Sequence, residues 1–375
     1  MEMSNLSALF LQKLGINASF YLTEDDFASQ RFLYSGIPQL EELVEMKKAG
    51  QFDFETVLLL YENSPIFEKN PADTAEFIRR SAQASIVGFV MVERQPSADS
   101  SLPDTGNCLV FTPVISDLET KSAFYSILPE LISKSAVLNC PTYQIEISPE
   151  EMADDVREYY SKNALAFFEE ADQTIPTYDS IYSPARVSKA AATIQKVREI
   201  AKAESFKTEN IEDESSEIKN SKKEFLAPQS SVLEICCGNG MSTLALYDEN
   251  VNPICVDINE EDICIGLSHG VLKPERTIIM DATTLSRNMN VEQFDTVIGF
   301  MVGTVYEFNK DVWFSIADEA LKMLKEDGFL LLTLREEHEA KMIADHLKEK
   351  GIDGAIVDNR DDETNYDSWI YFVQK

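Results

Sequence analysis

The chain has 375 residues, which is enough for two ordinary domains, and its apolar content of 44% is that of a soluble globular protein. Its 65 acidic residues outnumber its 33 basic residues, and the net charge of −32 disfavours general binding to the phosphate backbone of nucleic acids. No apolar run is long enough to span a bilayer, and the stretch MEMSNLSALFLQKLG lacks the features of a signal peptide, so we expect a cytoplasmic protein with no membrane partner.

The six cysteines show no CxxC pair and no metal-ligand spacing with histidine. Several of them lie within apolar runs, where a reduced cysteine packs as a small hydrophobic residue. We therefore expect structural, reduced cysteines and no bound metal.

Residues 1–175 combine short apolar runs with helical patterns and contain no internal repeat or catalytic motif. Strands are expected at 56–61, 86–93, 109–115 and 143–147, and helices at 39–48, 120–135 and 150–170. This pattern predicts a separate α+β domain. Substrate binding, a lid function and assembly into a homodimer all remain open as its role.

Residues 176–203 lead into the second half of the chain, with a turn that carries Tyr178 and Tyr182 before an amphipathic helix at 184–203. The two tyrosines either close over a ligand as a lid or pack at the domain junction. Residues 204–229 are charged, rich in serine and poor in apolar side chains, which predicts an exposed, acidic, flexible linker.

Residues 230–375 alternate between short apolar strands and amphipathic helices. Strands are expected at 232–237, 253–257, 277–280, 294–302 and 329–334, and the clearest helices at 312–325 and 337–350. Two last strands, in GAIVDN and SWIYFVQK, are separated by a polar turn that permits an antiparallel hairpin but not a helical crossover. We predict an α/β domain with a doubly wound, mostly parallel seven-stranded sheet and a C-terminal antiparallel hairpin.

Two glycines end the stretch VLEICCGNG, directly after the first of these strands. Open parallel sheets bind ligands beyond the carboxyl ends of their strands, and glycine there lets a ligand lie against the backbone. Asp257, at the end of the next strand, can accept hydrogen bonds from ribose hydroxyls in either a dinucleotide or another nucleoside cofactor. Glu234 disfavours the dinucleotide, because a carboxylate near the turn repels a pyrophosphate.

The stretches VLEICCGNG, ICVDIN, IIMDATT and FDTVIGFMVG, in this order before a terminal hairpin, resemble class I S-adenosylmethionine-dependent methyltransferases. The resemblance covers about residues 183–375 apart from the linker. The family motif is an acid followed by three alternating glycines, and Cys236 here replaces the first glycine, where a small thiol fits a tightly packed space. The resemblance implies S-adenosylmethionine as the cofactor and methyl transfer by direct displacement as the activity.

The resemblance also implies a set of cofactor contacts by position. Glu234 would lie near the methionine end, Asp257 would bind the ribose, and Asp281 would meet the adenine amino group unless it is only a helix N-cap. The other expected contacts are Gly238, Asn239, Gly240, Ile258, Ala282 and Phe300.

The segment after the fourth strand, GFMVGTVYEFNKD, faces the transferable methyl group in this family. It contains none of the Asn-Pro-Pro-Tyr, Pro-Cys or Asp-His patterns of the amino-group, cytosine or metal-assisted methyltransferases, and it offers no obvious general base. Tyr306 and Glu307 follow closely and are the candidate catalytic residues, which would orient a small-molecule or protein acceptor. A non-catalytic methyltransferase-like binding subunit and a nicotinamide-dependent oxidoreductase remain alternatives.

Overall fold

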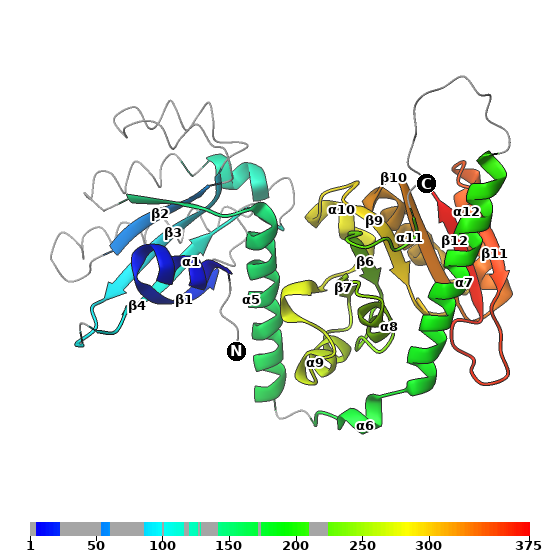
Figure 1. The fold of residues 1–375 in the computed structure, drawn as a ribbon, viewed down its shortest axis with the longest axis horizontal. Coiled ribbons are helices and arrows are strands. Elements are labelled where there is room, and N and C mark those ends of the chain that lie inside the picture. Colours follow the sequence, from blue (N-terminus) through cyan, green and yellow to red (C-terminus); the bar gives the residue numbers. More distant parts are fainter. Residues whose placement is uncertain are drawn as a thin grey trace, which may run out of the picture. The chain divides into compact units, whose positions relative to one another are not determined.

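The computed structural model describes residues 5–22, 54–60, 86–99, 101–115, 120–126, 128, 142–171, 174–209 and 224–375 (Figure 1). The chain forms two compact units, Met1–Tyr159 and Tyr160–Lys375. The division falls inside helix α5 (Pro149–Glu170), and not at residue 175 as the sequence pattern indicates. None of the helices in these ranges is long and apolar enough to cross a membrane.

Unit 1 contains a mixed five-stranded sheet in the order β1-β4-β3-β2-β5. Its elements are α1 (Asn5–Leu14), β1 (Ile16–Leu22), β2 (Phe54–Leu60), β3 (Ile86–Gln95), β4 (Asp104–Phe111) and β5 (Thr142–Glu146). Strand β3 runs antiparallel to both of its neighbours, whereas β1 pairs parallel with β4 and β5 pairs parallel with β2. The helix expected at 39–48 lies outside the described residues, as does most of the one expected at 120–135.

Helix α1 and strand β1 were not expected from the sequence. Leu6 and Phe10 of α1 are buried in the core of unit 1. The backbone amides of Asn5 and Leu6 donate to the two carboxylate oxygens of Asp155, at 3.0 and 2.7 Å. Asp155 therefore satisfies the N-terminal amides of α1, which have no partner within the helix itself.

Unit 2 contains a seven-stranded sheet in the order β11-β12-β10-β9-β6-β7-β8. Its strands are β6 (Val232–Ile235), β7 (Ile254–Asp257), β8 (Thr277–Ile279), β9 (Phe294–Gly299), β10 (Leu324–Leu334), β11 (Ala355–Asp358) and β12 (Trp369–Gln374). Strands β6 to β10 are parallel, and β12 runs antiparallel between β10 and β11. The prediction of an α/β fold built on a mostly parallel sheet is confirmed.

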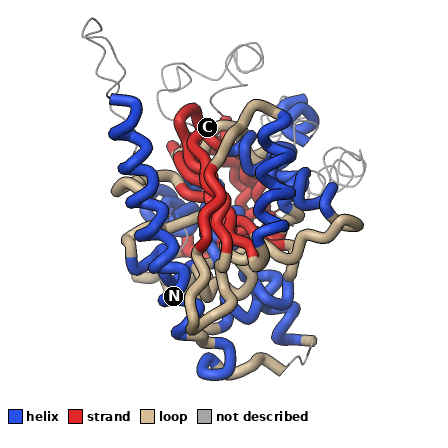
Figure 2. The backbone as a smooth tube through the Cα atoms, turned by 90° about the vertical axis from the view of Figure 1, so that its right-hand side faces the viewer, coloured by secondary structure: helices blue, strands red, loops and turns tan. Residues whose placement is uncertain are grey.

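Helices cover both faces of this sheet (Figure 2). The helices of unit 2 after α5 are α6 (Tyr178–Ile181), α7 (Pro184–Glu209), α8 (Thr243–Asp248), α9 (Glu260–Ser268), α10 (Leu285–Asn288), α11 (Lys310–Met323) and α12 (Glu337–Glu349), and α6 does not contribute to covering the sheet. One core cluster packs α11 and α12 against Leu233 and Ile235 of β6, whereas another packs α7 and α8 against Val232. Alternate residues of β6 therefore enter opposite cores, as expected for a strand buried on both faces.

Both ends of the linker predicted at 204–229 are structured. Helix α7 continues to Glu209, and Phe225 and Leu226 are buried in the same core as α7, 1% and 4% exposed. Phe225 packs its ring edge-on against Phe329 and Phe372 of the sheet. These two apolar side chains anchor the chain just before β6, and the intervening residues 210–223 lie outside the described ranges.

Candidate functional site

The order of the strands in unit 2 reverses at β6. The chain passes from β6 to β7 and β8 on one side of the sheet and then returns to β9 and β10 on the other side. Because these strands are parallel, the loops that follow them lie at one edge, where open sheets bind ligands. The beginning of α7 lies at this edge too, because Nε of Arg186 donates to Oγ of Ser242 at 2.9 Å, just after the glycine turn (Figure 1).

The glycine turn after β6 holds three alternating residues in the left-handed region. The φ angles of Cys236, Gly238 and Gly240 are 55°, 54° and 80°. A Cβ atom at Gly240 would lie 2.6 Å from Cδ2 of Leu272, whereas one at Gly238 would meet nothing within 4 Å. Gly240 thus permits close packing, and the backbone at Gly238 borders open space.

Cys236 replaces the first glycine of the motif and adopts a left-handed backbone conformation although it carries a side chain. Its φ of 55° is one that glycine adopts readily and that a residue with a side chain adopts at a cost of about 1–2 kcal/mol. The turn therefore keeps the backbone geometry of three glycines although only two are present.

Asp257 joins the turn after β6 to the turn after β7. Its Oδ2 atom accepts a hydrogen bond of 2.7 Å from the Gly238 amide, and its Oδ1 atom accepts one of 2.8 Å from the Asn259 amide. Each carboxylate oxygen keeps a further lone pair for a ligand hydroxyl. The next side chain, Ile258, is 66% exposed and offers an apolar surface beside the carboxylate.

Asp281 is a helix N-cap. Its Oδ1 atom accepts from the amide and the hydroxyl of Thr283, at 2.9 and 2.8 Å, at the start of the 3-10 helix Ala282–Thr284. Ala282 is 7% exposed and packs in the core. The capping role is thus established, and the expected contact of Asp281 and Ala282 with an adenine stays a prediction.

Glu234 is buried at the end of β6, before the turn, and its expected contact with the cofactor stays a prediction. Its side chain is 1% exposed and points to the same face of β6 as Val232. Burial raises the pKa of this carboxyl to about 7, although the positive charge of Arg186 opposes the shift. Oε2 accepts a long hydrogen bond of 3.7 Å from Sγ of Cys255, and Oε1 has no partner among the described residues.

Strand β9 ends at Gly299, three residues earlier than expected. A Cβ atom at Gly299 would lie 2.3 Å from Cγ1 of Val302, because the chain folds back over the glycine. Met301 has a φ of 51°, and its amide donates to Oγ1 of Thr333 at 2.7 Å. Phe300 is 1% exposed and packs in the core with α7, and its expected contact with the cofactor stays a prediction.

Comparison with known proteins gives matches among solved structures alone, since no family model and no curated protein matches the chain. A S-adenosylmethionine-dependent methyltransferase from Clostridium acetobutylicum is 18% identical, with a TM-score of 0.31, over 38% of this chain and 83% of that one. A methyltransferase from Archaeoglobus fulgidus is 14% identical, with a TM-score of 0.30, over 39% of this chain and 86% of that one. The 1,6-didemethyltoxoflavin-N1-methyltransferase of Burkholderia thailandensis, which holds S-adenosylhomocysteine, is 12% identical, with a TM-score of 0.36, over 61% of this chain and 91% of that one.

Unit 2 has the mostly parallel seven-stranded sheet and the C-terminal antiparallel strands that the sequence pattern predicts. The order of its strands reverses at β6, which is followed by the left-handed turn.

The loop after β9 has a fixed backbone and exposed side chains. Oε1 of Glu339, a fully buried residue of α12, accepts from the Val305 amide at 2.9 Å. Tyr306 is 51% exposed and stacks on Phe308 with ring centroids 5.3 Å apart. The side chain of Glu307 is 81% exposed and forms an ion pair with Lys310, so neither candidate catalytic residue is desolvated.

The two lid candidates lie against α9. Tyr178 and Tyr182 stack with ring centroids 5.3 Å apart, and Tyr178 meets His269 edge-on at 5.9 Å. Nε2 of His269 also lies 2.7 Å from the carbonyl oxygen of Pro176. The structure thus holds both tyrosines in an ordered aromatic cluster, and their closing over a ligand stays a prediction.

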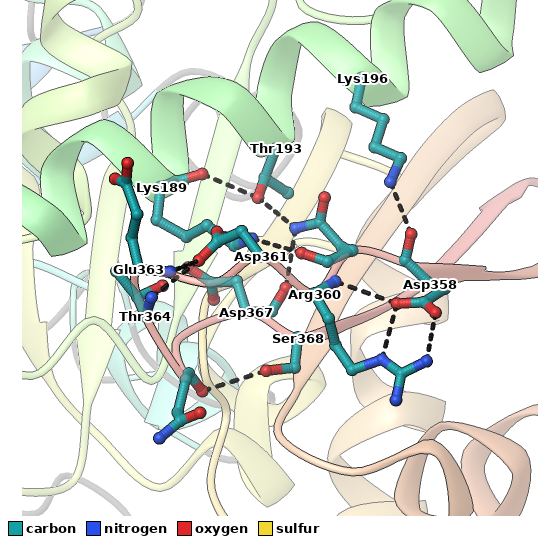
Figure 3. Close-up of polar contacts among 12 residues, drawn as sticks. Lys189, Thr193, Lys196, Asp358, Arg360, Asp361, Glu363, Thr364, Asp367 and Ser368 are labelled. Atoms are coloured by element: carbon teal, nitrogen blue, oxygen red, sulfur yellow. Dashed lines mark hydrogen bonds and ion pairs between the residues drawn. The ribbon is translucent and has the colours of Figure 1, made fainter.

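Sequence reasoning missed the polar contacts between α7 and the loop that joins β11 to β12 (Figure 3). The buried Lys189 side chain donates to the Asn359 carbonyl and pairs with Asp361. Nδ2 of Asn359 donates to Oγ1 of Thr193 at 2.9 Å and to the carbonyl of Asp367 at 2.8 Å. The signal in the sequence was the polar stripe Arg186, Lys189, Thr193 and Lys196 along one helix face.

Asp367 is a second missed residue at the edge of the site. It is fully buried, its Oδ1 atom accepts from the Thr333 hydroxyl, and its Oδ2 atom has no partner among the described residues. Thr333 in turn holds the Met301 amide. The Asp367 carboxylate is therefore linked to the end of β9 through Thr333. The segment directly after β9 gives no sign of this acid, because it begins with the apolar Phe300 and Met301.

Proposed function

We propose that the chain binds S-adenosylmethionine at the glycine turn of unit 2 and catalyses methyl transfer to a small-molecule or protein acceptor. The observation that carries this proposal is the run of left-handed residues at 236, 238 and 240 beside the Asp257 carboxylate, at the reversal point of the sheet. Among the similar solved structures, the Burkholderia thailandensis enzyme holds S-adenosylhomocysteine.

The residues of the site fit this cofactor by shape and by charge. Open space at Gly238 admits a ligand against the backbone, the free lone pairs of Asp257 suit ribose hydroxyls, and Ile258 offers an apolar surface to an adenine. Asp257 and Asp262 add negative charge, which attracts a cationic sulfonium and repels a pyrophosphate. The site therefore favours S-adenosylmethionine over a nicotinamide dinucleotide.

The bound cofactor supplies a methyl group on a positively charged sulfur, so the chain mainly has to align the acceptor and exclude water. Such positioning can supply roughly 7–11 kcal/mol of the barrier. The loop after β9 suits this task because Glu339 fixes its backbone, and because Oγ1 of Thr333 holds the Met301 amide at 2.7 Å. Tyr306 and Glu307 are proposed to orient an acceptor that is already nucleophilic near neutral pH.

The proposal is tested by transfer of a labelled methyl group. Wild-type protein and an Asp257→Ala variant are incubated with methyl-labelled S-adenosylmethionine and, separately, with the small-molecule and protein fractions of a cell extract. We expect S-adenosylhomocysteine and a labelled acceptor with the wild type and much less with the variant. Binding of the cofactor without its turnover in either fraction would instead assign a non-catalytic binding subunit.

A further inference from the structure

Asp367, two residues before β12, is a buried acid with one unused oxygen. Its Oδ1 atom accepts from the Thr333 hydroxyl, whereas its Oδ2 atom is closed to solvent and has no hydrogen-bond partner among the described residues. Burial raises the pKa of this carboxyl, and the Thr333 hydroxyl and the positive charges of Arg186 and Lys189 oppose the shift. A buried polar atom without a partner is unfavourable. The described part of the chain therefore leaves Oδ2 in need of a donor.

The backbone at Asp367 is unfavourable as well. Its φ is 48°, in the left-handed region that residues other than glycine seldom adopt. Nδ2 of Asn359 donates to the Asp367 carbonyl at 2.8 Å and helps to hold this conformation (Figure 3). Strained residues of this kind cluster at functional sites. An acid that is kept here in spite of strain and burial indicates a role for its free oxygen.

Thr333 connects this acid to the loop after β9. Its Oγ1 atom accepts from the Met301 amide at 2.7 Å, and its carbonyl oxygen accepts from the Val302 amide at 3.3 Å. Met301 is itself left-handed, with a φ of 51°, and its amide also opposes the rise in the pKa of Asp367. One threonine thus holds two left-handed residues together. One of them lies in the loop proposed to place the methyl acceptor, and the other carries the free oxygen.

We propose that the methyl acceptor is an amine and that Oδ2 of Asp367 accepts a hydrogen bond from its reacting nitrogen. The inference rests on the proposed function and names the acceptor group for that same site. A neutral amine donates an N–H to Oδ2 and keeps its lone pair for the methyl group, whereas a carboxylate has no proton to donate and a neutral hydroxyl is a weak nucleophile. The amine reaches Oδ2 by displacing one of two half-buried neighbours, Met301 or Tyr366.

The transfer then leaves a proton that Asp367 can take. The lone pair of the nitrogen forms a bond to the methyl carbon, the bond between that carbon and sulfur breaks, and its electron pair stays on sulfur. The methylated nitrogen is cationic, and one of its protons passes to Oδ2, from which it leaves to water when the product dissociates. Burial of Asp367 favours this protonated carboxyl, because it disfavours the charged form.

Selective blocking of amino groups tests the acceptor class with the wild-type protein. Small-molecule and protein fractions of a cell extract are acetylated with N-hydroxysuccinimidyl acetate and then treated with hydroxylamine, which restores hydroxyl groups. Mock-treated fractions are the matched control. With methyl-labelled S-adenosylmethionine, we expect a labelled acceptor in a mock-treated fraction and almost none after acetylation.

The Asp367→Asn variant tests the residue. Its amide keeps an oxygen for the Thr333 hydroxyl and places an NH₂ group where Oδ2 was, which cannot accept an N–H. We expect the rate of transfer to fall by about 100-fold or more, the effect of losing a group that accepts a proton, while calorimetry shows unchanged affinity for S-adenosylhomocysteine. The melting temperature of the variant should equal or exceed that of the wild type, because an ionisable carboxyl is no longer buried.

Asp358→Asn is the matched control for this variant. Asp358 is an exposed acid of the same hairpin and pairs with Arg360 at 2.5 Å. It makes no contact with Thr333 or Met301 among the described residues, so its replacement should leave the rate of transfer unchanged.

Three outcomes would overturn this inference and leave the proposed function standing. In one, label enters acetylated and mock-treated fractions equally, so the acceptor is not an amine. In the second, Asp367→Asn transfers methyl groups at the wild-type rate, so Asp367 only holds Thr333. In the third, the variant melts well below the wild type or loses S-adenosylhomocysteine, so Asp367 serves the fold or the cofactor. A wild type that labels no fraction would overturn the proposed methyl transfer together with this inference.

Discussion

The backbone amide of Gly238 donates a hydrogen bond of 2.7 Å to Oδ2 of Asp257, and this contact joins the loops that follow two neighbouring parallel strands. The other oxygen of the same carboxylate accepts from the Asn259 amide at 2.8 Å. One side chain therefore fixes the glycine turn and the loop after β7 in a single arrangement. The proposed ligand site at this edge of the sheet depends on that arrangement.

Replacing Asp257 by alanine should weaken binding of S-adenosylhomocysteine by about 1–3 kcal/mol, because charge-assisted hydrogen bonds to the ribose are lost. Asp257→Asn is the matched control, since its amide oxygen still accepts one backbone hydrogen bond, and its loss should be smaller. Calorimetry measures both affinities. Unchanged affinity in Asp257→Ala would remove this residue from the ligand site.

The buried Glu234 carboxyl should make stability depend on pH. Burial raises its pKa from 4.5 to about 7 in the folded chain, so the folded state binds more protons than the unfolded state between these values. The contribution of Glu234 to the free energy of unfolding is therefore fully present below pH 4.5 and falls as pH rises to 7, by on the order of 3 kcal/mol.

Urea unfolding at pH 5 and at pH 8 measures this dependence against the Glu234→Gln variant, which cannot ionise. We expect the variant to lose less stability than the wild type between the two pH values. Equal losses would show that Glu234 titrates normally in the folded protein.

At position 236, glycine should give a more stable protein than alanine, which is the reverse of their usual order in a helix. In a helix, glycine is less stable than alanine by about 1 kcal/mol, but the φ of Cys236 is 55°, where a Cβ atom is unfavourable. We expect Cys236→Gly to be more stable than Cys236→Ala by about 1 kcal/mol in urea unfolding. Ala344→Gly in α12 is the control and should be destabilising. If Cys236→Gly is also less stable than Cys236→Ala, the left-handed turn is contradicted.

Tyr306→Phe and Glu307→Gln should each lower the rate of methyl transfer by less than about 100-fold, the low end of general acid–base contributions. Both side chains are exposed, and Glu307 already pairs with Lys310, so neither is placed as a desolvated base. Single-turnover rates with the identified acceptor measure the effect. A loss of about 10⁴-fold in either variant with cofactor binding intact would reveal a dedicated base.

Local patterns in the sequence were sufficient to predict the sheet of unit 2 and the glycine turn of its candidate site. Strand β6 and its glycine turn show in consecutive residues, because burial on both faces demands an apolar run and a left-handed turn favours glycine. The end of β9 was mispredicted for a related reason. Phe300 and Val302 are buried although they lie outside the strand, so the apolar pattern continues past the point where the strand ends at Gly299.

The parts of the site that sequence reasoning missed depend on contacts between distant residues. Arg186 meets Ser242 across 56 positions, and Glu339 meets Val305 across 34. Helix α1 depends in the same way on Asp155, about 150 positions away. Periodicity within one element carries no information on such pairs. It also gives no information on the φ of Cys236, which is set by the surrounding turn.

The most direct test of the account is calorimetric titration of the wild-type protein with S-adenosylhomocysteine and, separately, with NAD. The open backbone at Gly238 and the Asp257 carboxylate predict saturable binding of S-adenosylhomocysteine and none of NAD, whose pyrophosphate would meet negative charge. Saturable binding of NAD without binding of S-adenosylhomocysteine would contradict the account and assign the site to a dinucleotide.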